Sequence, residues 1–181
     1  MTVVAVGIAV WALQTRESAH CPPQARIVER TPVAPPTPQW ASSVRAFSSE
    51  YSDSSWSVQQ ALGAPDVYPR SGDIANAWAS SEADAPTEFL EVAFATPQRM
   101  RALEIYETFN PGAITRVELI TEQGTRIVEP RRELRRNGGA AVSTFGTTCT
   151  KERIVGARLV VDSGNVAGWN EVDAVALLPC Q

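Results

Sequence analysis

The sequence predicts an all-β domain over residues 40–181, an antiparallel β-sandwich of the jelly-roll type with one short helix. Two observations support this fold class. From about Trp40 onward, apolar and polar residues alternate in runs of strand length, and Gly, Pro and Asn separate these runs. An apolar segment (residues 1–20) and a proline-rich linker (residues 21–39) come first, so one globular domain is expected in the 181-residue chain.

The expected strands follow one another through the domain. They cover residues 89–94, 102–109, 116–121, 125–129, 153–162 and 171–178. In the second of these, alternation places Leu103 and Ile105 opposite Glu104 and Tyr106. Gly124 lies between the third and fourth strands, where it predicts a hairpin turn.

One short helical turn is expected at residues 58–62. Ser54 or Ser55 would provide its N-cap side chain, because a hydroxyl accepts a bond from a free backbone N–H there. Gly63, followed by Pro65, would end it.

Composition excludes several classes of function. The net charge is -4, and nucleic acid is not expected as a partner because phosphate binding requires concentrated cationic surface. The only histidine, His20, precedes the domain, so triads and histidine-rich metal sites are not expected within it. The four arginines of residues 130–139 are expected on an exposed loop, with contact to an anionic partner as the alternative.

Enzymatic activity is not expected either. Glycoside hydrolysis requires two carboxylates about 5–10 Å apart across a cleft. Glu171 and Asp173 share one strand face, where carboxylates usually face solvent.

The N-terminal segment indicates export. The apolar run of residues 3–13 is shorter than the roughly 20 residues of a membrane span and has the length of a secretory signal core. No Lys or Arg precedes it, so both a cleaved signal peptide and an uncleaved membrane anchor remain open. The dense prolines of the linker predict an extended spacer. The expected location is extracytoplasmic (secreted, periplasmic or membrane-anchored), with membrane contact only through the N-terminal segment.

Two cysteines bracket the last two expected strands. In an exported protein, Cys149 and Cys180 are expected to form a disulfide. Closing a loop of this length stabilises a fold by roughly 3–4 kcal/mol. Cys21 is then left either free or linked to another molecule.

Three stretches, residues 61–81, 105–120 and 168–177, resemble a known family. In this order they are similar to discoidin-like domains, the galactose-binding-like jelly rolls of coagulation factor V/VIII type C. The resemblance is greatest to the variant attached to pappalysin-type proteases and to an F-box leucine-rich-repeat protein, and it runs from about Val44 to Leu178. It implies a non-catalytic domain that binds glycans, lipids or proteins through loops at one end, often with a structural calcium near the chain ends.

Possible calcium ligands are present in the sequence. Calcium requires six to eight oxygen ligands. The loop of residues 66–76 offers Asp66, Asp73 and Asn76, and the last strand offers Glu171. The alternative is an acidic, solvated loop held by Asx-turn hydrogen bonds.

Ligand contacts are expected at two places. Trp169 and Asn170 follow a glycine at an expected loop tip, and an aromatic ring there can stack on a sugar face. Glu107, Thr108 and Asn110 end a strand where a polar turn meets solvent.

Packing is the alternative for the tryptophans. Trp56 and Trp78 are expected in the core or at its edge, and Trp169 either packs or faces solvent. A domain without histidine does not inherit galactose specificity. The sequence thus predicts an extracytoplasmic module that binds a glycan or another surface ligand, and the alternative is a protein-interaction or structural domain with no small ligand.

Overall fold

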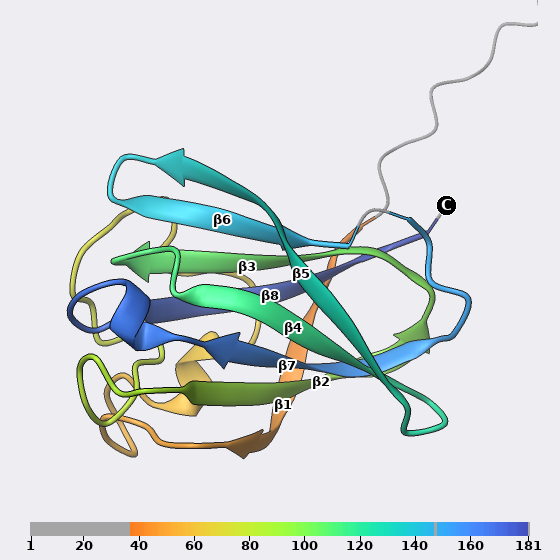
Figure 1. Ribbon diagram of the computed structural model, residues 1–181, viewed down its shortest axis with the longest axis horizontal. Helices are drawn as coiled ribbons and strands as arrows, with labels where there is room; N and C mark the ends of the chain where they lie inside the picture. Colours follow the sequence, from red (N-terminus) through yellow and green to blue (C-terminus); the bar gives the residue numbers. More distant parts are fainter. Residues whose placement is uncertain (1–36, 147, 181) are drawn as a thin grey trace, which may run out of the picture. The chain divides into compact units, whose positions relative to one another are not determined.

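Alternating apolar residues produce eight antiparallel strands in the computed structural model, which describes residues 37–146 and 148–180 (Figure 1). The strands are β1 (Gln39–Phe47), β2 (Glu88–Gln98), β3 (Met100–Phe109), β4 (Ile114–Thr121), β5 (Arg126–Asn137), β6 (Ala140–Phe145), β7 (Ile154–Val161) and β8 (Glu171–Pro179). In the described residues, helix is limited to two 3-10 turns, η1 (Val58–Ala61) and η2 (Ser163–Asn165). The predicted all-β antiparallel fold is confirmed.

The sheet closes on itself in the order β1-β2-β7-β4-β5-β6-β3-β8. Two strands, β1 and β5, close the sheet because each changes pairing partner along its length. The start of β1 pairs with β8 and its remainder with β2. Strand β5 pairs with β4 up to Pro130 and with β6 from Arg131, and Figure 1 shows it crossing between them. The eight strands therefore form a closed barrel, and the predicted jelly-roll sandwich stays a prediction.

The core fills the inside of this barrel. Leu103 and Ile105 point inward as the alternation predicts, and both are fully buried. Phe145 on β6 and Leu159 on β7 meet them in the same cluster. Trp78 also belongs to the core, as expected, and is 1% exposed.

The arginine-containing segment is a strand and not the expected loop. Residues 131–137 pair with β6 as the second half of β5. Pro130 lies where β5 changes partners, a position at which a missing N–H is tolerated. Arg131 is not free for an anionic partner, because its Nη1 donates to the carbonyls of Gly112 (2.7 Å) and Ile114 (3.1 Å).

The expected short helix is the 3-10 turn η1, with a different cap. Ser57 occupies the N-cap position without a side-chain bond. The backbone N–H of Val58 instead donates to Glu50 Oε2 at 2.8 Å. The predicted capping residues Ser54 and Ser55 donate their backbone N–H groups to Ser52 Oγ, so the prediction of the cap is wrong.

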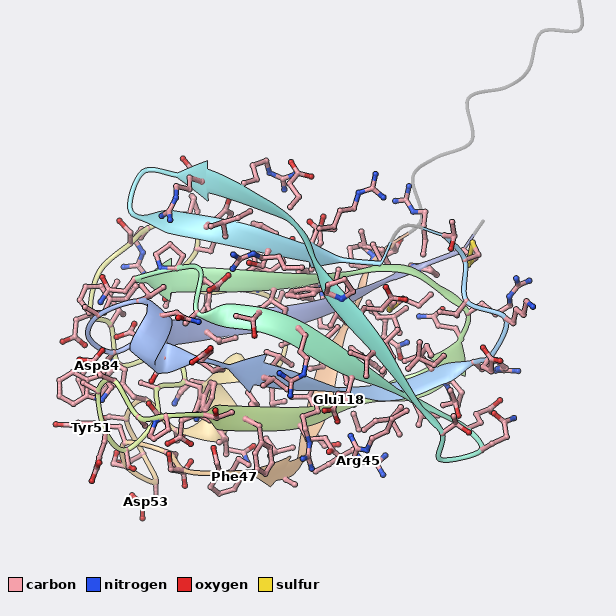
Figure 2. All side chains as sticks on the ribbon, in the orientation of Figure 1. Arg45, Phe47, Tyr51, Asp53, Asp84 and Glu118 are labelled. Atoms are coloured by element: carbon pink, nitrogen blue, oxygen red, sulfur yellow. A yellow bond between two sulfur atoms is a disulfide. The ribbon has the colours of Figure 1, made fainter. Side chains whose placement is uncertain are left out.

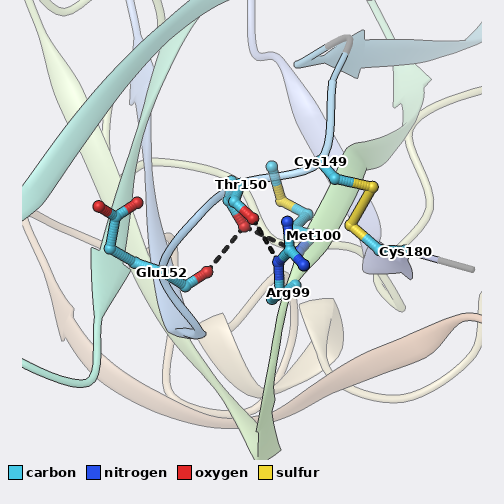
Figure 3. Close-up of a disulfide and its surroundings, with 6 residues drawn as sticks. All are labelled: Arg99, Met100, Cys149, Thr150, Glu152 and Cys180. Atoms are coloured by element: carbon cyan, nitrogen blue, oxygen red, sulfur yellow. Dashed lines mark hydrogen bonds between the residues drawn. A yellow bond between two sulfur atoms is a disulfide. The ribbon is translucent and has the colours of Figure 1, made fainter.

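The predicted disulfide between Cys149 and Cys180 is confirmed (Figure 3), with a Cα–Cα distance of 5.7 Å. It joins the β6–β7 connection to the residue that follows β8. Beside it, Thr150 Oγ1 accepts from the N–H of Met100 (2.9 Å), and Arg99 Nε donates to the Thr150 carbonyl (2.7 Å). The bond therefore anchors the final strand at the end where β3 begins.

The predicted signal or anchor, Cys21 and nearly all of the linker lie outside the described residues. Among the residues that are described, no helix is long and apolar enough to cross a membrane.

Strand β7 approaches β2 so closely at Gly156 that a Cβ there would lie 2.5 Å from the carbonyl oxygen of Val92. Gly156→Ala is expected to lower the free energy of unfolding by about 2 kcal/mol, because backbone atoms must shift. Chemical denaturation measures the change. Gly164→Ala is the matched control, with nothing within 4 Å of its Cβ, and equal effects of the two variants would contradict the expectation.

Replacing both Cys149 and Cys180 by serine is expected to lower the free energy of unfolding by about 3–4 kcal/mol, because the unfolded chain loses its cross-link. Denaturation with and without a reductant measures it. The reductant should destabilise the natural chain and leave the double variant unchanged. An unaffected natural chain would show that the bond contributes nothing.

Candidate functional site

A small pocket opens among the loops at the start of β8, which we call the loop-end pocket. Its volume is about 70 Å³, and it is lined by Tyr51, Trp56, Asp73, Ala79, Trp169 and Glu171. Figure 2 labels Tyr51 at this end of the barrel, with Asp53 and Asp84 on the neighbouring loops. Strand β8 runs from here to the disulfide, so the pocket and the cross-link lie at opposite ends of one strand.

Three aromatic rings form much of the pocket wall. Tyr51 packs edge-on against Trp56, with ring centroids 5.2 Å apart at 70°. It also packs against Trp169, at 5.9 Å and 85°. Tyr51 is 51% exposed and Trp169 37% exposed. Edge-to-face contacts orient the rings, and the pocket therefore presents fixed aromatic surface to solvent.

Hydrogen bonds with two other loops, the η1–β2 and β3–β4 connections, hold Trp169 in place. Its indole Nε1 donates to the Ser80 carbonyl at 3.2 Å, and its own carbonyl accepts from Asn110 Nδ2 at 2.9 Å. The preceding N–H, of Gly168, donates to Asp84 Oδ1 at 2.8 Å. Gly168 has a φ of +88°, which favours glycine. The ring position is thus set by the protein before any ligand binds.

Trp56 adopts an unusual backbone conformation at the pocket. Its φ is +51°, a left-handed value that is rare for a bulky residue. The loop enforces it, because the Trp56 N–H donates to the Ala75 carbonyl (2.9 Å) and its carbonyl accepts from Ala79 (3.1 Å). Such conformations concentrate at functional sites. The expectation that Trp56 lies in the core is met only in part, since it is half-buried and lines the pocket.

Glu171 lies at the base of the pocket and is 1% exposed. Its Oε1 accepts from Trp56 Nε1 at 3.1 Å, and its Oε2 accepts from the Ile74 N–H at 3.3 Å. The pKa of Glu171 is raised to about 8, mainly by burial and also by the neighbouring Asp73 carboxylate, although the hydrogen bonds from the Ile74 N–H and the Trp56 indole act in the opposite direction.

The predicted ligand residues divide by role. Trp169 lines the pocket, as the sequence suggests. Asn170 is buried, and its Nδ2 donates to the carbonyls of Asn110 (2.9 Å) and Val166 (3.3 Å). Asn110 in turn holds the Trp169 carbonyl. The two asparagines therefore position Trp169 and do not line the pocket.

Glu107 and Thr108 do not meet solvent, contrary to expectation. Both are buried, at 2% and 0% exposure. Glu107 continues the inward alternation of Ile105, where its carboxylate accepts from Ser143 Oγ (2.5 Å) and the Gly112 N–H (2.8 Å). Burial raises the pKa of Glu107. Its role here is to hold the β3–β4 turn.

The four predicted calcium ligands separate into two pairs. Asn76 Nδ2 donates to Asp66 Oδ2 at 3.0 Å, while Asp73 and Glu171 line the pocket. In the described part of the chain, no group of three or more His, Cys, Asp or Glu side chains is placed to hold a metal ion. Both Glu171 oxygens already accept N–H groups. A calcium shell of six to eight oxygens would need further ligands besides this set, and calcium binding stays a prediction.

Asp173 is buried as well, so the expectation that the β8 carboxylates face solvent is wrong for both. Its oxygens accept the backbone N–H groups of Asp66 (3.2 Å), Val67 (3.3 Å) and Tyr68 (2.7 Å). Bonds from N–H groups offset the cost of burying a carboxylate. Asp173 therefore fixes the turn that leads into the Asp73 loop.

Sequence reasoning missed Tyr51 as a pocket residue and placed Trp56 in the core. Neither belongs to an alternating run, so periodicity gave no signal for them. The available signal was the serine-rich stretch around them, which is typical of a loop.

These features define an all-β barrel that carries its exposed aromatic site on loops. The family model described as "Pappalysin-1, SD scarf domain, C-terminal" matches residues 34–180. The chain belongs to this family, which confirms the pappalysin part of the resemblance. The broader discoidin-like assignment and the F-box relative stay predictions.

No curated protein matches the sequence. A solved structure is similar in fold: a chain from the X-ray crystal structure of reduced XRCC1 bound to DNA pol beta catalytic domain. The TM-score is 0.60 and the sequence identity 13%, over 80% of this chain and 100% of that chain. At this identity the likeness shows the fold alone.

The raised pKa of Glu171 has a measurable consequence for stability. Its pKa is about 8 in the folded protein against an ordinary value of 4.5, so the folded state binds the proton more tightly than the unfolded chain. Its contribution to the free energy of unfolding should be complete below pH 4.5 and lost as the pH rises to about 8. Glu171→Gln should reduce this slope by about 1 kcal/mol per pH unit.

Urea denaturation at a series of pH values measures the slope. Glu107 and Asp173, whose pKa values burial also raises, are present in both proteins and cancel in the difference. Glu152→Gln, at an exposed site, is the control. Parallel curves for the natural chain and Glu171→Gln would contradict the prediction.

Proposed function

We propose that this domain is a non-catalytic extracytoplasmic binding module that recognises a glycan or another surface ligand at the loop-end pocket. The observation that carries the proposal is the pair of exposed rings, Tyr51 and Trp169, held beside two carboxylates. Binding sites combine apolar and aromatic walls with a few placed polar groups, and this pocket has that composition.

A sugar has the chemistry that such a pocket accepts. Aromatic faces stack on its C–H face, and the oxygens of Asp73 accept hydrogen bonds from its hydroxyls. The pocket volume is about 70 Å³, against about 150 Å³ for a cavity that encloses benzene. The edge of a ligand therefore enters the pocket, and the remainder lies across Tyr51 and Trp169.

Two observations support the location and the finer fold. Disulfides such as Cys149–Cys180 persist in oxidising compartments, which favours an extracytoplasmic site. The strand order runs β1-β8-β3-β6 on one side of the barrel and β2-β7-β4-β5 on the other. This division of the strands between two sides is typical of a jelly roll. It favours the discoidin-like relationship.

Catalysis is not part of the proposal. The buried carboxylates at this end have structural partners: Asp173 accepts three backbone N–H groups, and Glu171 accepts Trp56 and Ile74. Glu171 and Asp73 share the pocket, but they are close enough to hydrogen-bond and do not stand about 5–10 Å apart across a cleft as glycoside hydrolysis requires.

A protein-interaction domain is the second candidate. Phe47 is 41% exposed at the end of β1, and Figure 2 shows it on the same side of the molecule as Tyr51. Exposed aromatic side chains are enriched at protein interfaces. A partner that binds this surface without using the pocket would favour this alternative.

The full chain is expected to bind at least one glycan on an array. Tyr51→Ala and Trp169→Ala should each weaken that binding about tenfold, because each removes a stacking face. Titration calorimetry with the glycan measures the affinities. Val128→Ala is the control, since Val128 is 58% exposed on β5 and outside the pocket.

The outcome separates the two candidates. No glycan binding, together with a protein partner whose affinity is unchanged by Tyr51→Ala and Trp169→Ala, would reject the glycan proposal in favour of protein interaction.

A further inference from the structure

We infer that the loop-end pocket selects a compact alkylammonium cation, the charged group of a quaternary amine or of an amino sugar. This inference rests on the proposed function, because it names the ligand chemistry of the same pocket. Three observations carry it: the arrangement of the rings, the exposed Asp73 carboxylate, and the size of the pocket.

Three aromatic rings meet at large angles in the lining of the pocket. Tyr51 stands at 70° to Trp56 and at 85° to Trp169, within 6 Å of each. Aromatic faces attract cations through their negative π surface, and several faces around one point form the cages that bind quaternary ammonium groups. A neutral sugar requires one stacking face, whereas this pocket has three rings in its lining.

The Asp73 carboxylate gives the pocket negative charge, whereas Glu171 is largely protonated at neutral pH because its pKa is about 8. Asp73 and Glu171 both line the pocket. The ion pairs formed among residues 37–146 and 148–180 involve Glu91, Glu118 and Glu122, and none includes either pocket carboxylate. None of the arginines that form these pairs lines the pocket. A ligand cation would therefore meet the Asp73 carboxylate, which forms no ion pair with a side chain of the described domain.

The size of the pocket favours a small head group. Its volume of about 70 Å³ is several times the roughly 10–15 Å³ that one water requires, and half of what encloses benzene. A primary ammonium group fits this range, whereas a trimethylammonium group, which is about as bulky as benzene, or a whole sugar ring enters only in part. The remainder of the ligand would leave through the mouth beside Tyr51 and Trp169, which are exposed.

The test uses two matched pairs of compounds on the full chain. Choline is compared with its neutral carbon isostere 3,3-dimethylbutan-1-ol, and glucosamine with N-acetylglucosamine. NMR shifts of the indole N–H signals of Trp56 and Trp169 report binding. At least one charged member should bind with a dissociation constant of about 1 mM, and its neutral partner about tenfold more weakly. A preference in the first pair identifies a quaternary amine, and one in the second pair an amino sugar.

Variants assign the effect to the pocket. Asp73→Asn, at an exposed position, should weaken the charged ligand about threefold to fivefold and leave its neutral partner unchanged. Trp169→Leu keeps apolar volume but removes the π face, and should weaken the charged ligand about tenfold. Val128→Ala should change neither, and thermal melting confirms that each variant is folded.

Two results would overturn the inference. Equal affinity within both pairs would show that the pocket binds its ligand without regard to charge. The proposed binding function would then stand, and the preference for a cation would be rejected. No shift with any of the four compounds would also reject the cation, and the glycan array then decides the proposed function by itself.

Discussion

The loop end of the barrel depends on two carboxylates that are buried at the start of β8. Asp173 accepts hydrogen bonds from the backbone N–H groups of Asp66, Val67 and Tyr68. Glu171 accepts hydrogen bonds from the Ile74 N–H and the Trp56 indole. A buried carboxylate without donors is costly, so the connection between η1 and β2 must bring its backbone to these oxygens. That same connection carries Asp73, and the pocket takes its shape from this requirement.

The closed sheet provides the rigid frame for these loops. Because β1 and β5 each pair on both sides, the eight strands have no free edge. Strand β8 begins at the pocket and ends beside the disulfide, so both ends of its length are fixed. Loops on such a scaffold are free to carry binding residues, and here they hold aromatic side chains in solvent at defined angles.

Alternation in the sequence predicted the inward faces of β2 and β3, because one side of each strand must be apolar to fill the barrel. Where residue charge and periodicity disagreed, the assignment made from charge was wrong. Glu107 was assigned to solvent by its charge, although its place after Leu103 and Ile105 points inward, and the partners that permit its burial, Ser143 and Gly112, come from elsewhere in the chain. Likewise Arg131 suggested a loop, whereas the continuation of β5 is set by pairing with β6.

The sequence by itself determined the all-β class, most strand positions, the Cys149–Cys180 bond and the loop that carries Trp169, since each depends on a local pattern or a residue type. Only the tertiary structure decided what the site contains. Trp56 and Glu171 are 115 residues apart in sequence and meet through a hydrogen bond between two loop ends. Tyr51 orients both tryptophans through ring contacts that follow no periodicity. Such contacts form only when the barrel closes and the buried carboxylates fix the loops, because no local pattern specifies which distant side chain will satisfy them.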